Sequence, residues 1–122
     1  MAFGSVAVNE RYKDLHLEID FGRSAVALDT RRVVLTRKEY ELLALLVQHA
    51  GEIIPRGALL WQVWGYSDQI RTRTLDVHIR RLRKKLGDYS EQYIETIFGI
   101  GYRFQPFRSQ RVFQAYAAPA VA

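Results

Sequence analysis

The stretch TRTLDVHIRRLRKKL, residues 72–86, decides the fold, and Gly87 follows it directly. At 100° per residue, four apolar side chains of this stretch fall within an arc of about 60°: Leu75, Ile79, Leu82 and Leu86. This spacing predicts an amphipathic helix whose apolar side packs against a core. We expect the helix to end at Gly87.

Positive charge is concentrated in the same part of the chain. Residues 71–85 hold seven of the 18 basic side chains and one of the 13 acidic ones, Asp76. The basic residues are Arg71, Arg73, Arg80, Arg81, Arg83, Lys84 and Lys85. The net charge of the chain is +5, so the other 107 residues together carry −1. Because a solvated helix face normally pairs acids with bases four residues apart, this segment predicts an anionic partner.

The side of this helix opposite the leucines combines basic residues with one aliphatic residue, Val77. The basic residues on that side are Arg73, Arg80, Arg81 and Lys84, with Thr74 at its edge and His78 on the flank. In the major groove of DNA, an aliphatic side chain suits the thymine methyl, and an arginine fork suits guanine edges and phosphates. We therefore interpret this side as a DNA-binding surface, and the alternative is an ordinary solvated face.

The preceding region predicts a buried central helix. Thr36 and Glu39 have the spacing of a capping box, and Leu35 and Tyr40 that of a hydrophobic staple. The leucine-rich run that follows leaves almost no polar face, so we expect this helix to lie in the core. Gly51 is expected to end it as a left-handed cap.

A shorter helix is predicted over residues 56–64, between Pro55 and Gly65. Proline is tolerated at a helix N-terminus, whereas Gly57 would cost up to about 1 kcal/mol in a helix interior. The run 65–70 that follows has the composition of a loop. This helix, loop and basic helix have the order of a helix-turn-helix.

Short strands are expected at both ends of these helices. Alternating apolar residues over 15–21 and the runs 24–28 and 32–35 predict a small antiparallel sheet. Residues 93–97 and 102–104 flank a glycine-containing turn and predict a β-hairpin. The fold class is therefore α+β: a winged helix-turn-helix with an N-terminal antiparallel sheet, a three-helix core and a C-terminal hairpin wing.

The expected organisation is a single domain with short extensions. Residues 1–12 are interpreted as a lead-in or linker remnant, 13–105 as the domain, and 106–122 as a disordered tail. No apolar run is long enough to cross a bilayer, and the first residues do not have the pattern of a signal peptide. The absence of cysteine fits a reducing compartment, so we expect a cytoplasmic protein.

The residues argue against an enzyme. The chain has no cysteine, which excludes a thiol nucleophile and a cysteine-ligated zinc. The three histidines, His16, His49 and His78, are too dispersed to predict a metal site. Neither a phosphate-binding glycine loop before a helix nor a G-x-S-x-G motif occurs. We expect no catalytic residue, no metal and no cofactor.

Three stretches closely resemble the C-terminal effector domain of the OmpR/PhoB family of response regulators. They are LTRKEYELLALLVQHAGEIIPRGALLWQVWG (35–65), RTRTLDVHIRRLRKKLGD (71–88) and YIETIFGIGYRF (93–104). The resemblance covers roughly residues 15–105 and implies a fourth N-terminal strand within residues 3–12. It implies a bacterial regulator of transcription in a two-component system, which binds specific double-stranded DNA as tandem dimers on direct repeats and associates with the nucleoid. A receiver domain and a sensor kinase are implied as partners if the chain is an excised part of a longer regulator, which we favour over an orphan regulator.

The resemblance also implies roles for individual residues. Arg81 is the expected base reader and Val77 the thymine-methyl contact. The other expected DNA contacts, mostly to phosphates, are Arg56, Trp64, Arg73, Thr74, His78, Arg80, Arg83, Lys84, Thr96 and Arg103. The loop expected to touch RNA polymerase is Gly65, Tyr66, Ser67, Asp68, Gln69 and Ile70.

One residue departs from the pattern of this family. Phe98 stands in the wing where the family often has an arginine that reaches the minor groove. Phenylalanine cannot replace that charge, so the resemblance does not carry a minor-groove contact over to this chain. The alternative function is a winged-helix module that binds a protein through loop 65–70 or the wing and has only nonspecific affinity for DNA.

Overall fold

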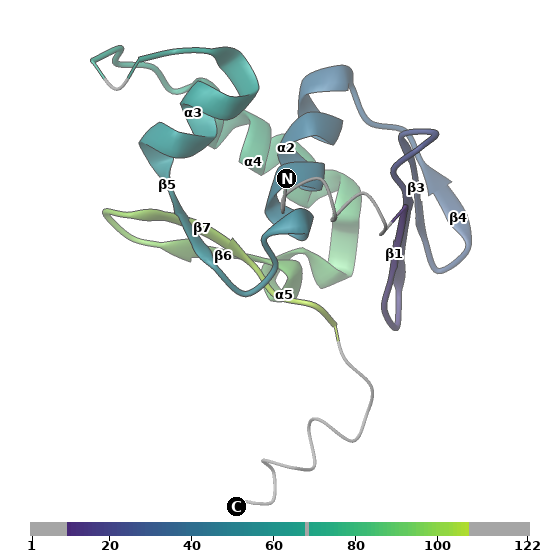
Figure 1. The fold of residues 1–122 in the computed structure, drawn as a ribbon. Coiled ribbons are helices and arrows are strands. Elements are labelled where there is room, and N and C mark those ends of the chain that lie inside the picture. The colour runs from purple at the N-terminus through teal and green to yellow at the C-terminus, as the bar shows by residue number, and fades with distance from the viewer. Residues whose placement is uncertain (1–9, 68, 108–122) are drawn as a thin grey trace, which may run out of the picture.

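The computed structural model describes residues 10–67 and 69–107. In Figure 1 the N-terminal sheet lies at one end of the molecule and the C-terminal hairpin at the other, with the main helices between them. Of the expected lead-in (1–12) and tail (106–122), residues 1–9 and 108–122 lie outside the described residues. The described fold begins before residue 13 and continues to Phe107, which packs against the core.

The N-terminal sheet has four antiparallel strands in the order β1-β2-β3-β4. The strands are β1 (Arg11–Lys13), β2 (Leu17–Asp20), β3 (Ala25–Leu28) and β4 (Arg31–Val33). The predicted alternation is visible in β2, where Leu17 and Ile19 are buried. Strand β1 is the fourth strand that the resemblance implied, but it ends at Lys13, beyond the expected range of residues 3–12. Asp29 and Thr30 connect β3 to β4 and both have positive φ, as a tight hairpin turn requires.

Helix α2 (Arg37–Gln48) begins with the predicted capping box. The backbone N–H of Glu39 donates to the Thr36 hydroxyl, and the Thr36 N–H donates to the Glu39 carboxylate at 2.9 Å. The predicted position of the cap was wrong, because the C-cap is His49 and not Gly51. Gly51 does have the predicted left-handed backbone, with φ +88°. The His49 and Ala50 amides already bond the last carbonyls of the helix, and the Gly51 amide instead donates to Phe104 at 2.8 Å.

Helix α3 (Arg56–Trp64) has the predicted bounds, and Gly65 is a left-handed cap with φ +75°. Gly57 lies in its first turn, where the cost of an interior glycine does not apply. Helix α4 (Thr74–Leu86) begins two residues later than predicted. The reason is local, since the Thr72 hydroxyl accepts the Thr74 N–H at 3.1 Å and holds the chain before the helix.

The hairpin belongs to a three-stranded sheet in the order β5-β7-β6. Strands β6 (Ile94–Ile97) and β7 (Gly101–Phe104) form the predicted hairpin, and β5 (Ile53–Pro55) was not predicted. Strand β5 approaches so closely that a Cβ at Gly101 would lie 2.0 Å from the Ile54 carbonyl oxygen. Two short unpredicted elements, η2 (Gly87–Tyr89) and α5 (Ser90–Tyr93), lead from α4 into β6.

One core joins all of these elements. The four apolar residues predicted to face inward from α4 are at most 1% exposed. They pack with the leucines of α2 and with Tyr93 and Phe104, whose rings stack at 5.4 Å between centroids. This packing fixes which side of α4 remains on the surface.

Candidate nucleic-acid interface

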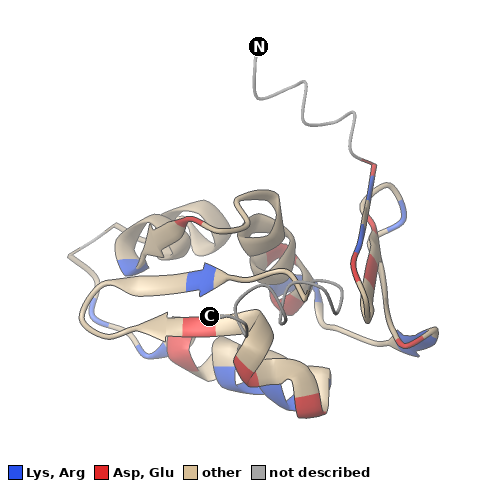
Figure 2. Cartoon of the chain, turned by 90° about the horizontal axis from the view of Figure 1, so that it is seen from below, with Lys and Arg blue, Asp and Glu red and all other residues tan. Residues whose placement is uncertain are grey.

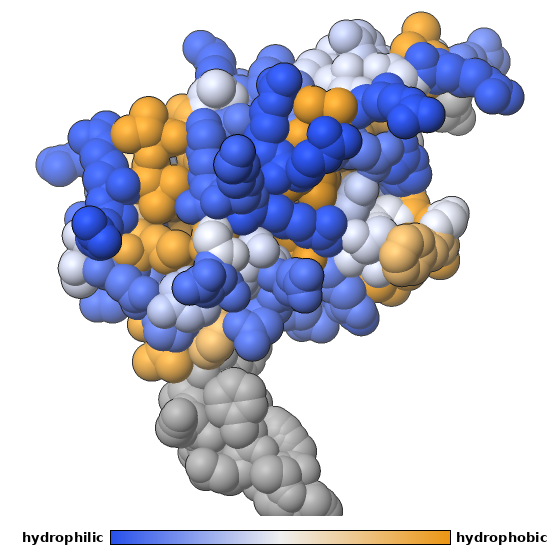
Figure 3. Space-filling view, turned by 180° about the vertical axis from the view of Figure 1, so that it is seen from behind, coloured by the Kyte–Doolittle hydropathy of each residue, from blue (hydrophilic) through white to orange (hydrophobic). Residues whose placement is uncertain are grey.

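The outward side of α4 carries unpaired positive charge. Its four cations, which we call the basic face, are Arg73, Arg80, Arg81 and Lys84, and all four are exposed. Within residues 10–67 and 69–107, none of the four makes a salt bridge. Lys and Arg recur along α4 in Figure 2, and Figure 3 shows hydrophilic side chains gathered over the region of this helix. The charges therefore lie on the side that the sequence predicts.

Three predicted contact residues of α4 are half-buried: Thr74, Val77 and His78. His78 Nδ1 lies 2.8 Å from the Thr74 carbonyl oxygen. Because a carbonyl only accepts, we assign the proton to Nδ1. The His78 ring also meets Trp64 of α3 edge-on, with 4.9 Å between centroids. This contact ties α4 to the end of α3.

Arg56 differs from the basic face because its charge has a partner inside the fold. Asp76 Oδ1 accepts hydrogen bonds from Arg56 Nη1 and from the Tyr102 hydroxyl, each at 2.5 Å. The hydrogen bond from Arg56 holds the pKa of Asp76 below its usual value. Burial, together with the bond to Asp76, raises the pKa of Tyr102 to about 12. The start of α3, the start of α4 and strand β7 thus meet at one carboxylate.

Three further predicted contact residues are also engaged within the fold. Arg83 Nη2 donates to the Ile94 carbonyl at 2.8 Å and to the Thr96 hydroxyl at 2.7 Å. Arg103 pairs with Glu95 at 2.9 Å on the adjacent strand. Arg83, Thr96 and Arg103 therefore anchor the hairpin to α4 and strengthen the hairpin itself.

Lys85 makes the remaining ion pair of α4. Its ammonium lies 2.6 Å from the carboxylate of Glu39 in the capping box of α2. Glu39 is only 2% exposed. Burial acts to raise the pKa of Glu39, but the bonds from Lys85 and Thr36 outweigh it and the pKa is lowered. This pair locks the end of α4 onto the beginning of α2.

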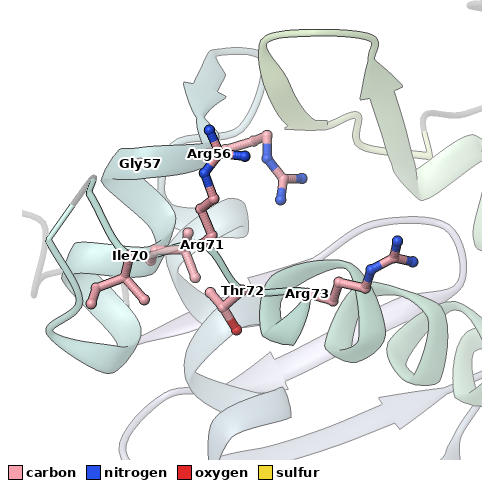
Figure 4. A pocket seen from close by; sticks show the side chains of 7 residues that line it. Arg56, Gly57, Ile70, Arg71, Thr72 and Arg73 are labelled. Carbon is pink, nitrogen blue, oxygen red and sulfur yellow. The ribbon is translucent and has the colours of Figure 1, made fainter.

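A cavity of about 580 Å³ opens between the start of α3 and the loop before α4. Three arginines line it, Arg56, Arg71 and Arg73, together with Gly57, Leu60, Ile70 and Thr72. Figure 4 shows the Arg71 side chain extending toward the beginning of α3. The N-terminus of a helix favours anions, and the cap position of α3, Pro55, makes no side-chain capping bond. The site is therefore chemically suited to a phosphate group.

Arg71 is absent from the set of DNA contacts expected from the resemblance. It precedes the helical turns, so the helical wheel does not select it, and the resemblance implied no contact for it although it begins the stretch 71–88. Its position in the basic run of residues 71–85 was the available signal.

The expected polymerase-contact loop lies on the surface next to this cavity. Gly65, Tyr66, Ser67, Gln69 and Ile70 are exposed, and Asp68 lies outside the described residues. The Ile70 N–H donates to the Ser67 carbonyl at 3.1 Å, so the loop turns back on itself. Tyr66 and Ile70 are its exposed apolar side chains.

The part of the chain that the structure describes contains neither a metal-site cluster nor a membrane-spanning helix. The described His, Asp and Glu side chains form no group of three that could hold a metal ion. No helix among these residues is long and apolar enough to cross a membrane.

Comparisons with known proteins point in one direction. Residues 30–104 match the family described as "Transcriptional regulatory protein, C terminal". The transcriptional regulatory protein HprR of Escherichia coli is 43% identical over 99 residues, which cover 80% of this chain and 44% of HprR. The chain thus spans less than half the length of this curated relative.

Two solved structures share the fold. The RstA DNA-binding domain of Klebsiella pneumoniae, in complex with the RstA box, superposes with a TM-score of 0.75 at 35% identity, covering 81% of this chain and all of that one. The Thermotoga maritima response regulator DrrB, an OmpR/PhoB homologue, gives a TM-score of 0.71 at 35% identity and covers 79% of this chain and 44% of that one.

Proposed function

This chain belongs to the OmpR/PhoB family of transcriptional regulators, whose C-terminal domain it matches, and we propose that it binds specific duplex DNA with α4 in the major groove. The observation that carries the proposal is the basic face of α4, where exposed cations stand without salt bridges in the described structure. Such a face repels itself unless an anion neutralises it. The RstA domain, which has this fold and was solved in complex with its DNA box, supports DNA binding.

We assign the reading of sequence to two side chains in the middle of α4. The exposed guanidinium of Arg81 has no salt bridge among the described residues, so it is available for a bidentate contact to guanine. Val77 supplies the apolar surface that suits a thymine methyl. We assign phosphate contacts to the side chains around them: Arg71, Arg73, Thr74, His78, Arg80 and Lys84.

Arg56 and the wing residues receive different roles. Arg56 keeps its place beside the cavity that suits a phosphate, although its charge is shared with Asp76. Arg83 and Thr96 bond each other, and Arg103 pairs with Glu95. We therefore propose that these three residues position the hairpin more than they hold DNA.

The wider biological context follows from family membership and is part of the proposal. We propose that the chain acts as the output domain of a two-component response regulator, with a receiver domain and a sensor kinase as partners. Tandem binding to direct repeats and contact of loop 65–70 with RNA polymerase belong to the same proposal. We also propose that it works in the cytoplasm as a binding protein without catalytic activity.

The test is a selection of bound sites from a pool of random duplex DNA. We expect the wild-type chain to enrich one motif, repeated in tandem at a fixed spacing. Arg23→Ala, on the opposite sheet, should enrich the same motif, whereas Arg81→Ala should lose preference at one position in each repeat. If the wild type enriches no motif, the proposal is wrong and the alternative of a protein-binding module with nonspecific DNA affinity is favoured.

A further inference from the structure

The tip of the β6–β7 hairpin presents an aromatic side chain to solvent. Phe98 is 89% exposed, and Ile100 beside it is also exposed. Elsewhere in the hairpin, Ile94, Tyr102 and Phe104 are buried. The exposed apolar side chains of the hairpin are therefore at the turn, and Ile97 before it is half-buried. A single exposed apolar residue is ordinary on a protein surface. A role for Phe98 must therefore be inferred from the residues around the tip.

Backbone hydrogen bonds hold the tip in place. The Ile100 N–H donates to the Ile97 carbonyl at 2.9 Å, which closes the turn, and Gly99 takes the positive φ of +78° that the turn needs. The Arg56 N–H donates to the Ile100 carbonyl at 2.9 Å. Phe98 thus projects from a fixed frame that is bonded to the first residue of α3.

The tip also stands beside the arginine cavity. Arg56, whose amide holds the tip, lines that cavity with Arg71 and Arg73. Arg56 is paired with Asp76, but Arg71 and Arg73 make no salt bridge among the described residues. An apolar tip next to these two cations does not fit a membrane interior or an apolar protein surface, because they would lose hydration there without an anionic partner. Duplex DNA offers both chemistries together, with phosphates for the arginines and sugar and base surfaces for the ring.

We propose that Phe98 acts as an apolar wedge in the minor groove next to the major groove that α4 occupies. This inference rests on the proposed function. Minor-groove proteins insert apolar side chains, including phenylalanine, between base steps and bend the duplex. A neighbouring phosphate bound in the arginine cavity holds the Phe98 side chain at the minor groove. Phe98 is thereby a specificity-determining residue that reads deformability instead of charge.

The proposal makes a definite prediction about flanking sequence. Pyrimidine–purine steps such as TA unstack easily, whereas A-tracts are stiff and attract arginine to their narrow minor groove. A wedge therefore prefers TA steps under the hairpin, and an arginine at the same place prefers an A-tract.

The experiment measures the affinity of the chain for duplexes that share one selected core and differ only in the flank, either TA steps or an A-tract. We expect the wild type to bind the TA flank several-fold more tightly. Phe98→Ala should lose about tenfold in affinity for that flank and bind both flanks equally, with an unchanged salt dependence. Phe98→Arg should prefer the A-tract and steepen the slope of log K against log salt by about one.

Val34→Ala is the matched control, because Val34 is 73% exposed and lies after β4 at the other end of the molecule. It should bind both flanks as the wild type does. The inference is overturned if Phe98→Ala binds both duplexes as tightly as the wild type, or if the wild type does not distinguish the flanks. Failure of the proposed function looks different, since the wild type would then bind a scrambled core as tightly as the selected one.

Discussion

Helix α4 carries two kinds of positive charge on two sides. On the side that faces the rest of the fold, Lys85 pairs with buried Glu39 and Arg83 bonds Thr96. On the outward side, no cation of the basic face has a salt bridge to a described residue. The two sides of one basic helix therefore have different roles. The inward cations hold the helix in place, and the outward cations remain available for a ligand.

This division separates two measurable properties. Substitutions on the inward side should change the free energy of unfolding, and substitutions on the outward side should change the affinity for DNA. A substitution that changed both to the same extent would weaken the distinction.

The largest effect is expected from Glu39→Ala. Glu39 accepts bonds from Lys85 and from the Thr36 amide. Loss of a charged hydrogen-bond acceptor and of the capping box should lower the free energy of unfolding by about 2–4 kcal/mol. Urea unfolding followed by circular dichroism measures this value.

Glu41→Ala is the matched control on the same helix. Glu41 pairs with Arg37 and Lys38 at the surface, so its loss should cost less than about 1 kcal/mol. If both variants lost the same free energy of unfolding, burial of the Glu39–Lys85 pair would add nothing to its contribution to stability.

Arg81→Ala should have the next largest effect, and on affinity only. Loss of a bidentate base contact costs about 1–3 kcal/mol on the selected duplex. A scrambled duplex should be affected less, and the unfolding midpoint should stay the same because Arg81 makes no salt bridge within the described structure. Arg23→Ala, whose side chain pairs with Asp20 on the N-terminal sheet, is the control. If Arg81→Ala weakens both duplexes equally, Arg81 contacts only phosphate.

Lowering the pH is expected to have a smaller effect on the free energy of unfolding. The pKa of folded Glu39 lies below its ordinary value of 4.5, so its contribution to stability is complete above pH 4.5 and is lost as the pH falls through the folded pKa. The stability of wild type and Glu39→Gln should therefore differ most near neutral pH and converge on acidification. Unfolding curves at several pH values test this, and a constant difference would contradict it.

Local signals in the sequence predicted much of the fold. Thr36 and Glu39 predicted the start of α2, and Pro55 and Gly65 predicted the two ends of α3. These predictions succeed because capping and backbone preference act within a few residues. Strand β5 was missed because three residues become a strand only through their partner. That partner is β7, at whose Gly101 the absence of a side chain permits close approach.

The candidate site was predicted less completely than the fold. The helical wheel placed the basic face on the surface, since periodicity alone determines which side of a helix is buried. It could not reveal that Arg56 meets Asp76 or that Arg83 meets Thr96, because these pairs are 20 and 13 residues apart in the chain. The sequence therefore predicted where the charges lie. Only the tertiary structure shows which of them have partners among the described residues.

The most direct test of the central claim is the salt dependence of binding to the selected duplex. Each phosphate that a cation neutralises contributes about −0.9 to the slope of log K against log salt. The five cations assigned to phosphates predict a slope of about −4.5 for each bound domain. They are Arg56, Arg71, Arg73, Arg80 and Lys84. A slope near zero would contradict the claim that the outward side of α4 binds DNA.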